Sequence, residues 1–555
     1  MNSLMIPFRR LLIGVFLLSL CFSSFSATPS LAAPSTPKIA WSPCYRDLGP
    51  FECGTVQVPL DYSQPDRAAI SIALVRLPAS DQANKIGSVF LNPGGPGGSG
   101  FDFALQIGPF LAWAGLGAQF DIVGFDPRGI YRSTALKCFG NTQQYLATQP
   151  PFVFPYTTEQ EPLLMASNEA VVSACDQRAG RIIDHMTTAD VARDLDLLRQ
   201  AVGDEQLSYM GFSYGSYLGV TYANLFPDRV RALVVDAVLD PVAWATGVNG
   251  EGTSVPLPTR LKEYVDAEAT LAEFFRLCDA GGPNCAFAPN SAARFNQLAD
   301  RLKAAPLIIP MPDGTTIVFT YDLLITNTLV SMYTASTWPD LAGLLAALEY
   351  FASPAEVGLR LQALREQLGL TTKRGIPNYA NYEGQMAVAC SDTDNPLDFA
   401  VWSAAAHATE QQYPIFGSIW TWIWSTCSTW PGPSASRYTG PFTANTANPV
   451  LVVGSTYDPA TPYQGAVTVH DLLPNSALLT VDGWGHGSII MSTCALMTEL
   501  NYLIYGVTPP EGARCAADVV PFADPPASAL ARASNALAYD LSGVFLPDFL
   551  KKFVP

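Results

Sequence analysis

The feature that most constrains this sequence is the pattern G-x-S-x-G at residues 211–215, with Ser213 at its centre. Residues 206–210 (QLSYM) are typical of a short buried strand, and residues 216–225 are typical of a helix. A serine on a sharp turn from strand to helix needs glycine on both sides, because the turn leaves no room for a Cβ. We therefore interpret Ser213 as a nucleophile, and the alternative is a Gly- and Ser-rich loop that matches by chance.

Apolar segments that alternate with helical segments predict a mainly parallel sheet with helices on both sides, which is an α/β fold. Strands are expected at residues 69–77, 86–91, 120–125, 206–210, 231–236, 448–454 and 477–481. Ahead of residues 206–210, an amphipathic helix is predicted, with Thr187 or Thr188 as its N-cap. One face of that helix carries Val191, Leu195, Leu198 and Val202.

The alternation of strands and helices stops near Asp240 and resumes near residue 448. Residues 241–440 are helical and aromatic in character, which predicts an inserted, mostly helical cap domain. The first part of the core is then expected at residues 34–240. The second part, with a C-terminal extension, is expected at residues 441–555.

A glycine-rich loop, Asn92 to Gly100, directly follows the predicted strand at residues 86–91. Such a run of glycines lets backbone N–H groups approach a ligand closely. We expect an oxyanion hole formed by the N–H groups of Gly95 and Tyr214. A surface loop without a catalytic role is the alternative.

A serine hydroxyl needs a base to take its proton and an acid to orient that base. Asp458 follows one late strand and His486 follows the next, and loops after parallel strands open at the same sheet edge. The order Ser213, Asp458, His486 is the order used by α/β-hydrolases. The rivals are Asp482 for the acid and, for the base, His185, His407 and His470.

Residues 1–33 are interpreted as a signal peptide, because Arg9 and Arg10 precede a short apolar stretch at residues 11–20. Lipidation at Cys21 is the less favoured alternative. We therefore expect a secreted or periplasmic protein, in which the ten remaining cysteines form disulfides rather than free buried thiols. Proximity in sequence suggests the pairs Cys44–Cys53, Cys138–Cys175, Cys278–Cys285, Cys390–Cys427 and Cys494–Cys515.

The composition of the chain argues against several kinds of partner and cofactor. The chain has 555 residues, of which 49% are hydrophobic, so a large core can form. Its net charge of −17 argues against nucleic acid as a partner. Four histidines and no C-x-x-C pair argue against zinc, and no metal or organic cofactor is expected. Beyond the signal peptide, no apolar run is long enough for stable membrane insertion.

Five motifs together carry a family resemblance: NPGGPGGSG at residues 92–100, FDPRG at 125–129, GFSYGSYLG at 211–219, YDPATP at 457–462 and GWGHG at 483–487. With them, the chain resembles the secreted tripeptidyl aminopeptidase group of the proline-iminopeptidase-like serine peptidases from about residue 40 to about residue 520. The resemblance implies an α/β-hydrolase fold with a helical cap, and peptide substrates with a free N-terminus.

The resemblance has one departure and one further implication. Asn92 stands where the proline iminopeptidases have histidine, so specificity for proline does not follow. The group recognises the substrate's amino group with acidic residues of the cap, for which Glu383 and Asp392 are the candidates here.

The function expected from these observations is that of a secreted serine exopeptidase. It would release short peptides or single residues from peptide N-termini through an acyl-enzyme. An esterase or lipase of the same fold is the nearest alternative, because the same triad opens esters. A non-catalytic binding protein on this fold is the other alternative.

Overall fold

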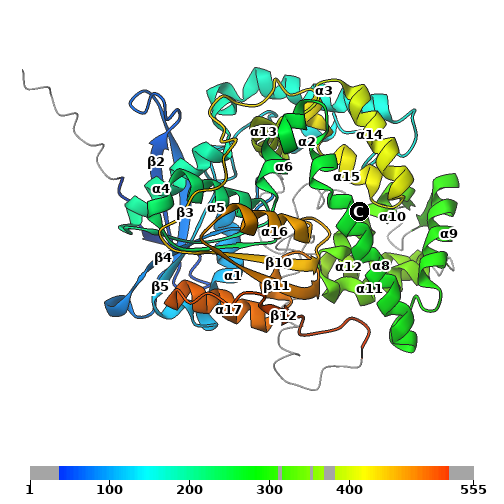
Figure 1. The fold of residues 1–555 in the computed structure, drawn as a ribbon. Coiled ribbons are helices and arrows are strands. Elements are labelled where there is room, and N and C mark those ends of the chain that lie inside the picture. The colour runs from blue at the N-terminus through cyan, green and yellow to red at the C-terminus, as the bar shows by residue number, and fades with distance from the viewer. Residues whose placement is uncertain (1–36, 311–315, 350–353, 368–381, 524–555) are drawn as a thin grey trace, which may run out of the picture. The chain divides into compact units, whose positions relative to one another are not determined.

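The computed structural model describes residues 37–310, 316–349, 354–367 and 382–523. The predicted signal peptide and the end of the predicted C-terminal extension lie outside these residues. Within them, a ten-stranded sheet runs through the core (Figure 1). Its strand order is β1-β2-β3-β5-β4-β6-β7-β10-β11-β12.

The sheet is antiparallel at its N-terminal edge and parallel elsewhere. The strands β1, β2, β3 and β5 pair antiparallel, whereas every pair from β5 onward is parallel. The bounds are β1 Ser42–Pro43, β2 Glu52–Pro59, β3 Ala69–Leu77, β4 Gly87–Asn92, β5 Phe120–Phe125, β6 Leu207–Phe212, β7 Val230–Asp236, β10 Val450–Tyr457, β11 Ser476–Trp484 and β12 Arg514–Ala516. Sequence patterning did not indicate β1, β2 or β12.

Helices cover both faces of the sheet, as predicted for an α/β fold (Figure 1). The helices α1 (Gly100–Trp113) and α17 (Thr493–Tyr505) pack on one face. The helices α4 (Thr188–Val202), α5 (Tyr214–Leu225) and α16 (Tyr463–Leu472) pack on the other. The helices α2 (Thr142–Leu146) and α3 (Glu161–Arg178) lie between β5 and α4 in the chain.

Helix α4 shows how the sequence builds these layers. Thr187 is its N-cap and accepts a hydrogen bond from the N–H of Asp190, and Gly203 ends it in the left-handed conformation. Val191, Leu195 and Leu198 are buried in the core. Each such side chain contributes roughly 1.5–3 kcal/mol by leaving water, so burial of this face holds the helix against the sheet.

Between β7 and β10, residues 241–449 form what we call the inserted segment. Its helices gather beside the sheet in Figure 1 (green to yellow). They are α6 Pro241–Ala245, α7 Leu257–Leu261, α8 Glu263–Gly281, α9 Ser291–Ala304, α10 Tyr321–Met332, α11 Trp338–Glu349, α12 Pro354–Gln367, α13 Tyr382–Asp392, α14 Phe399–Gln412 and α15 Gly417–Ile423. A small antiparallel hairpin, β8 (Leu307–Pro310) and β9 (Thr316–Phe319), interrupts the helices and was not expected.

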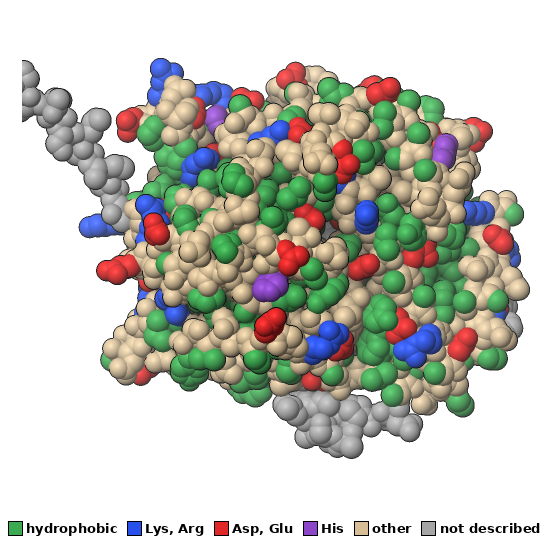
Figure 2. Space-filling model, in the orientation of Figure 1, with side chains coloured by type: hydrophobic (Ala, Val, Ile, Leu, Met, Phe, Trp, Pro, Cys, Tyr) green, Lys and Arg blue, Asp and Glu red, His purple; other side chains and the backbone are tan. Residues whose placement is uncertain are grey.

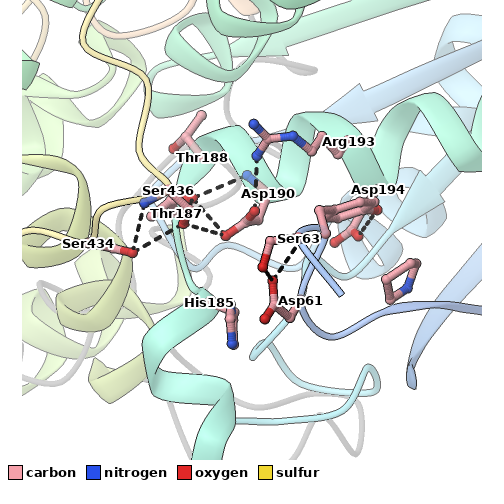
Figure 3. Close-up of polar contacts among 12 residues, drawn as sticks. Asp61, Ser63, His185, Thr187, Thr188, Asp190, Arg193, Asp194, Ser434 and Ser436 are labelled. Carbon is pink, nitrogen blue, oxygen red and sulfur yellow. Dashed lines mark hydrogen bonds and ion pairs between the residues drawn. The ribbon is translucent and has the colours of Figure 1, made fainter. Parts of the chain in front are cut away.

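The end of the inserted segment is tied to the start of α4 by a polar cluster (Figure 3). The hydroxyl of Ser436 donates to Asp190 at 3.0 Å, and the hydroxyl of Thr187 donates to the same carboxylate at 2.9 Å. Arg193 pairs with the other oxygen of Asp190 at 3.0 Å. The cluster therefore places the return of the inserted segment against the core.

Five disulfides occur among the described residues, and they join the cysteines that are neighbours in sequence, pair by pair as suggested above. On the face shown in Figure 2, acidic, basic and apolar side chains are interspersed. A search of the described helices for one long and apolar enough to cross a membrane finds none.

Candidate active site

Ser213 occupies the strained turn that the G-x-S-x-G pattern predicts. Strand β6 ends at Phe212 and helix α5 begins at Tyr214, so a single residue connects them. Ser213 has φ 57° and ψ −127°, a conformation that residues with a Cβ rarely adopt. The backbone N–H of Ser213 donates to the carbonyl of Asp236 at 3.1 Å, which holds the turn against β7.

The glycines that flank Ser213 are required by backbone crowding. A Cβ on Gly211 would lie 2.4 Å from the carbonyl oxygen of Gly215, and a Cβ on Gly215 would lie 2.6 Å from the carbonyl oxygen of Asn92. Gly94 is equally confined, because its Cβ would come within 2.8 Å of the Tyr214 nitrogen. The glycine-rich loop therefore runs directly beside the nucleophile turn.

The backbone N–H groups of Gly95 and Tyr214, which we predicted to form the oxyanion hole, lie in this loop and at this turn. Tyr214 is the first residue of α5, where backbone N–H groups have no intrahelical acceptor. The N–H of Gly94 is occupied, since it donates to the side-chain oxygen of Asn92 at 2.9 Å. Within the described residues, the next N–H along the loop, that of Gly95, has no acceptor. Asn92 thus anchors the loop at the position where the proline iminopeptidases have histidine.

Asp458 and His486 are in direct contact. Both carboxylate oxygens of Asp458 lie 2.9 Å from Nδ1 of His486, and both side chains are buried. The N–H groups of Ala460 and Thr461 donate to the same carboxylate at 2.9 Å. Because Nδ1 donates to the carboxylate, Nε2 is the nitrogen that can accept a proton. Among the described residues, Nε2 of His486 has no hydrogen-bond partner.

Two further groups hold the imidazole. The hydroxyl of Thr461 lies 2.9 Å from Asp458 Oδ2 and 3.2 Å from His486 Nδ1. The ring of Tyr333, at the end of α10, meets the imidazole edge-on with centroids 5.2 Å apart, and its carbonyl accepts from the backbone N–H of His486 at 2.9 Å. The inserted segment therefore contributes to the orientation of the candidate base.

The rival residues are engaged elsewhere. Asp482 is exposed and forms an ion pair with Arg514. His407 pairs with Glu161 at 3.0 Å, and His470 is 2.9 Å from the hydroxyl of Ser476. His185 ends a short 3-10 helix ahead of α4 and lies near Asp61 (Figure 3). None of them has a hydrogen bond to Asp458 among the described contacts.

Buried acids of the inserted segment lie close to this centre. Asp392 accepts from the N–H of Thr188 at 2.9 Å and from its hydroxyl at 2.5 Å, so it is committed to the start of α4. Burial raises the pKa of Asp392 to about 7, against these hydrogen bonds. Glu383 is buried on α13, the helix whose Gln385 lies against Gly97 of the glycine-rich loop.

A third buried acid, Glu263 at the start of α8, was not singled out from the sequence. Burial raises its pKa well above the usual range, a hydrogen bond from Trp424 opposes this, and the charge of Asp458 adds to it. Tyr333 also experiences the charges of both Glu263 and Asp458, besides its desolvation by burial, and its pKa is likewise raised. Glu263 therefore belongs to the surroundings of the candidate base, and nothing in its local sequence indicates this.

Comparison with known sequences agrees with this geometry. The model of a family described as alpha/beta hydrolase fold matches residues 87–256, and that of a family described as TAP-like protein matches residues 413–515. The tripeptidyl aminopeptidase of Streptomyces lividans is 29% identical over 87% of this chain and 87% of its own length. Serine protease Hip1 of Mycobacterium tuberculosis is 30% identical over 88% of this chain and 92% of its own length.

The chain belongs to the tripeptidyl aminopeptidase-like group of the α/β-hydrolase family. It is a serine hydrolase of that group. The group contains proteins with different names, since a relative named carboxylesterase B, from Mycobacterium tuberculosis, is 30% identical over 93% of this chain and 98% of its own length. Membership therefore establishes the fold and the class of enzyme.

We expect Ser213→Ala to lower kcat by about 10⁴-fold or more, because the nucleophile is lost while the turn is kept. Labelling of the wild type with a fluorophosphonate, followed by peptide mapping, checks the assignment. Thermal denaturation of the variant serves as the control for folding. Covalent label on a serine other than Ser213 would contradict the assignment.

We expect Asp458→Asn to reduce kcat strongly, on the order of 10⁴-fold, because the imidazole loses the group that sets its tautomer. Asp482→Asn is the matched control and should retain nearly full activity, since the side chain of Asp482 is exposed and, in the described contacts, bonds only Arg514. Steady-state kinetics of both variants decide between them. An inactive Asp482→Asn beside an active Asp458→Asn would show that the acid is misassigned.

Proposed function

We propose that this chain is an exported serine exopeptidase that removes short peptides or single residues from free peptide N-termini, with Ser213 as nucleophile, His486 as base and Asp458 as acid. The observation that carries the proposal is the buried Asp458–His486 pair, whose Nε2 is left free to accept a proton. The strained Ser213 turn and the peptidase names of the relatives support it.

The reaction follows from these roles. Ser213 Oγ attacks the scissile carbonyl while His486 Nε2 takes the hydroxyl proton, and Asp458 stabilises the resulting imidazolium. The N–H groups of Gly95 and Tyr214 stabilise the oxyanion. His486 then protonates the departing amine, which leaves an ester on Ser213. Water hydrolyses this ester by the same proton transfers in reverse order, and no cofactor takes part.

A free N-terminus would be recognised by a buried acid of the inserted segment, and we assign Glu263 this role ahead of the two candidates taken from sequence. A neutral, desolvated carboxyl becomes charged when an ammonium group arrives, because the pair then compensates the cost of burial. Glu263 has this environment and lies near the base. Asp392 is occupied by Thr188, whereas Glu383 stays a second candidate beside the glycine-rich loop.

Export is supported by two observations. Residues 1–33 have the sequence character of a signal peptide, and five disulfides in the described part of the chain are typical of an oxidising compartment. We therefore place the mature enzyme outside the cytoplasm.

A panel of chromogenic substrates tests the reaction. We expect turnover of peptides with a free N-terminus to exceed that of the same peptides bearing an N-acetyl group by about 100-fold, because the ammonium group must pair with a buried carboxylate. Short acyl esters form the third arm of the panel. Preference for esters over free peptides would instead select the esterase, and absence of turnover in every arm would refute an enzymatic role.

We expect Glu263→Gln to lower kcat/KM for free-N-terminal peptides by about 30- to 1,000-fold, because a buried charge pair is lost. Activity on N-acetyl peptides should change by less than about threefold, because they carry no ammonium group. Glu268→Gln is the matched control on the same helix, since among the described contacts the Glu268 carboxylate accepts only from the backbone N–H groups of Ile415 and Phe416. Equal losses on both substrate types would contradict the role of Glu263 in amine recognition.

A further inference from the structure

Beneath the candidate active site, one serine hydroxyl joins two buried carboxyl groups. Ser488 Oγ lies 3.0 Å from Oδ2 of Asp236 and 2.9 Å from Oε1 of Glu499. The backbone N–H of Ser488 also donates to Asp236, at 2.7 Å. Both carboxyls are fully buried, and the second oxygen of each has no hydrogen-bond partner among the described residues.

The single hydroxyl hydrogen of Ser488 determines which of the two carboxyls is protonated. A hydroxyl has one hydrogen, so Ser488 can donate to only one of the two carboxyls. The other contact is favourable only if that carboxyl carries a proton and donates it to the hydroxyl oxygen. Asp236 receives the backbone N–H as well, which stabilises its charged form. Glu499 has only the hydroxyl contact, so Glu499 is the group that holds the proton.

The electrostatic surroundings of Asp236 and Glu499 favour one negative charge on the pair rather than two. The charged groups that act on Asp236 from neighbouring loops are Asp458 after β10, which disfavours its ionisation, and His486 after β11, which favours it. On β7 and α17 themselves, Arg231 and Tyr502 bond backbone carbonyls rather than either carboxyl. Burial and the neighbouring Asp236 raise the pKa of Glu499 well above its usual range.

The cluster connects the two loops that carry the candidate base and nucleophile. Ser488 is two residues after His486, at the start of the 3-10 helix Ser488–Ile490. Asp236 ends β7, and its carbonyl accepts from the backbone N–H of Ser213. Displacement of Ser488 would therefore move the base loop relative to the nucleophile turn.

We propose that Glu499 is a positioning residue, a neutral acid whose proton completes the chain Glu499 to Ser488 to Asp236, and that loss of this proton limits the enzyme at alkaline pH. With Glu499 ionised, two carboxylates compete for one hydroxyl hydrogen, and the base loop loses its fixed place. The expected loss of activity at alkaline pH rests on the proposed function, because it assumes that His486 acts as the base for Ser213.

The test uses the mature protein and the rate at which a fluorophosphonate labels Ser213 between about pH 6 and pH 10. Glu499→Gln replaces the acid by a neutral amide that can still donate to Ser488, so the rate at neutral pH should stay within about threefold of wild type. The alkaline pH at which the labelling rate of Glu499→Gln declines should be higher than in wild type by at least about one pH unit, because the titrating group is gone. Glu499→Leu removes the donor and should slow labelling about tenfold.

The matched control is Asp204→Asn. Asp204 is a largely buried carboxyl that accepts from the N–H of Ser88 at the opposite ends of the strands, and burial raises its pKa too. The labelling rate of Asp204→Asn should decline at the same alkaline pH as that of wild type. An unchanged alkaline decline in Glu499→Gln would overturn the proposal, even if Glu499→Leu failed to fold.

Two measurements without turnover separate this proposal from the proposed function. Other buried carboxyls, such as Glu263, contribute to the infrared absorption of protonated carboxyls in both proteins. The difference spectrum between wild type and Glu499→Gln at neutral pH should therefore contain one protonated-carboxyl band, which belongs to Glu499. The Tm of Glu499→Gln should exceed that of wild type by a margin that grows as pH rises above about 4.3, because the native state alone keeps the proton there. If Ser213 is never labelled, the proposed function fails, and the difference spectrum still decides the state of Glu499: absence of the band from that difference spectrum would refute the assignment.

Discussion

The structure depends most on the turn at Ser213, where the chain passes from β6 to α5 through one residue with positive φ. Such a conformation costs of order 1–3 kcal/mol and persists only where neighbouring structure enforces it. Here the enforcement comes from Asp236, whose carbonyl holds the Ser213 N–H, and from Asn92 and Gly94, which crowd the turn from the other side. The sheet order makes this possible, because β6 lies between β4 and β7.

The same arrangement explains why part of the geometry of the candidate site could be predicted from sequence. Ser213, Asp458 and His486 each follow an apolar strand, and parallel strands deliver their following loops to one edge. The contact between Asp458 and His486 agrees with that reasoning. The mainly parallel sheet and its covering helices were predicted for the same reason, because buried parallel strands are visible as short apolar runs.

The parts that escaped prediction depend on tertiary packing or on very short elements. Glu263 resembles any acid in the first turn of a helix, and only its burial distinguishes it. The strand β12 has three residues at the sheet edge, too few to show a periodicity. Glu499 did leave a signal, since it stands with Leu496, Leu500 and Leu503 at helical spacing on a buried face. A charge within an apolar stripe indicates a buried acid with a specific partner.

The disulfides each close a short local loop, with partners 7 to 37 residues apart in sequence. Two lie wholly inside the inserted segment and three wholly inside the remainder, so none of these five cross-links the two. Within the described part of the chain, the covalent connections between them are the polypeptide near residues 240 and 450, while Asp392, Ser436 and Tyr333 supply non-covalent contacts. Oxidation thus stiffens each part internally without clamping one to the other, and a separation of the two parts would need no change in redox state.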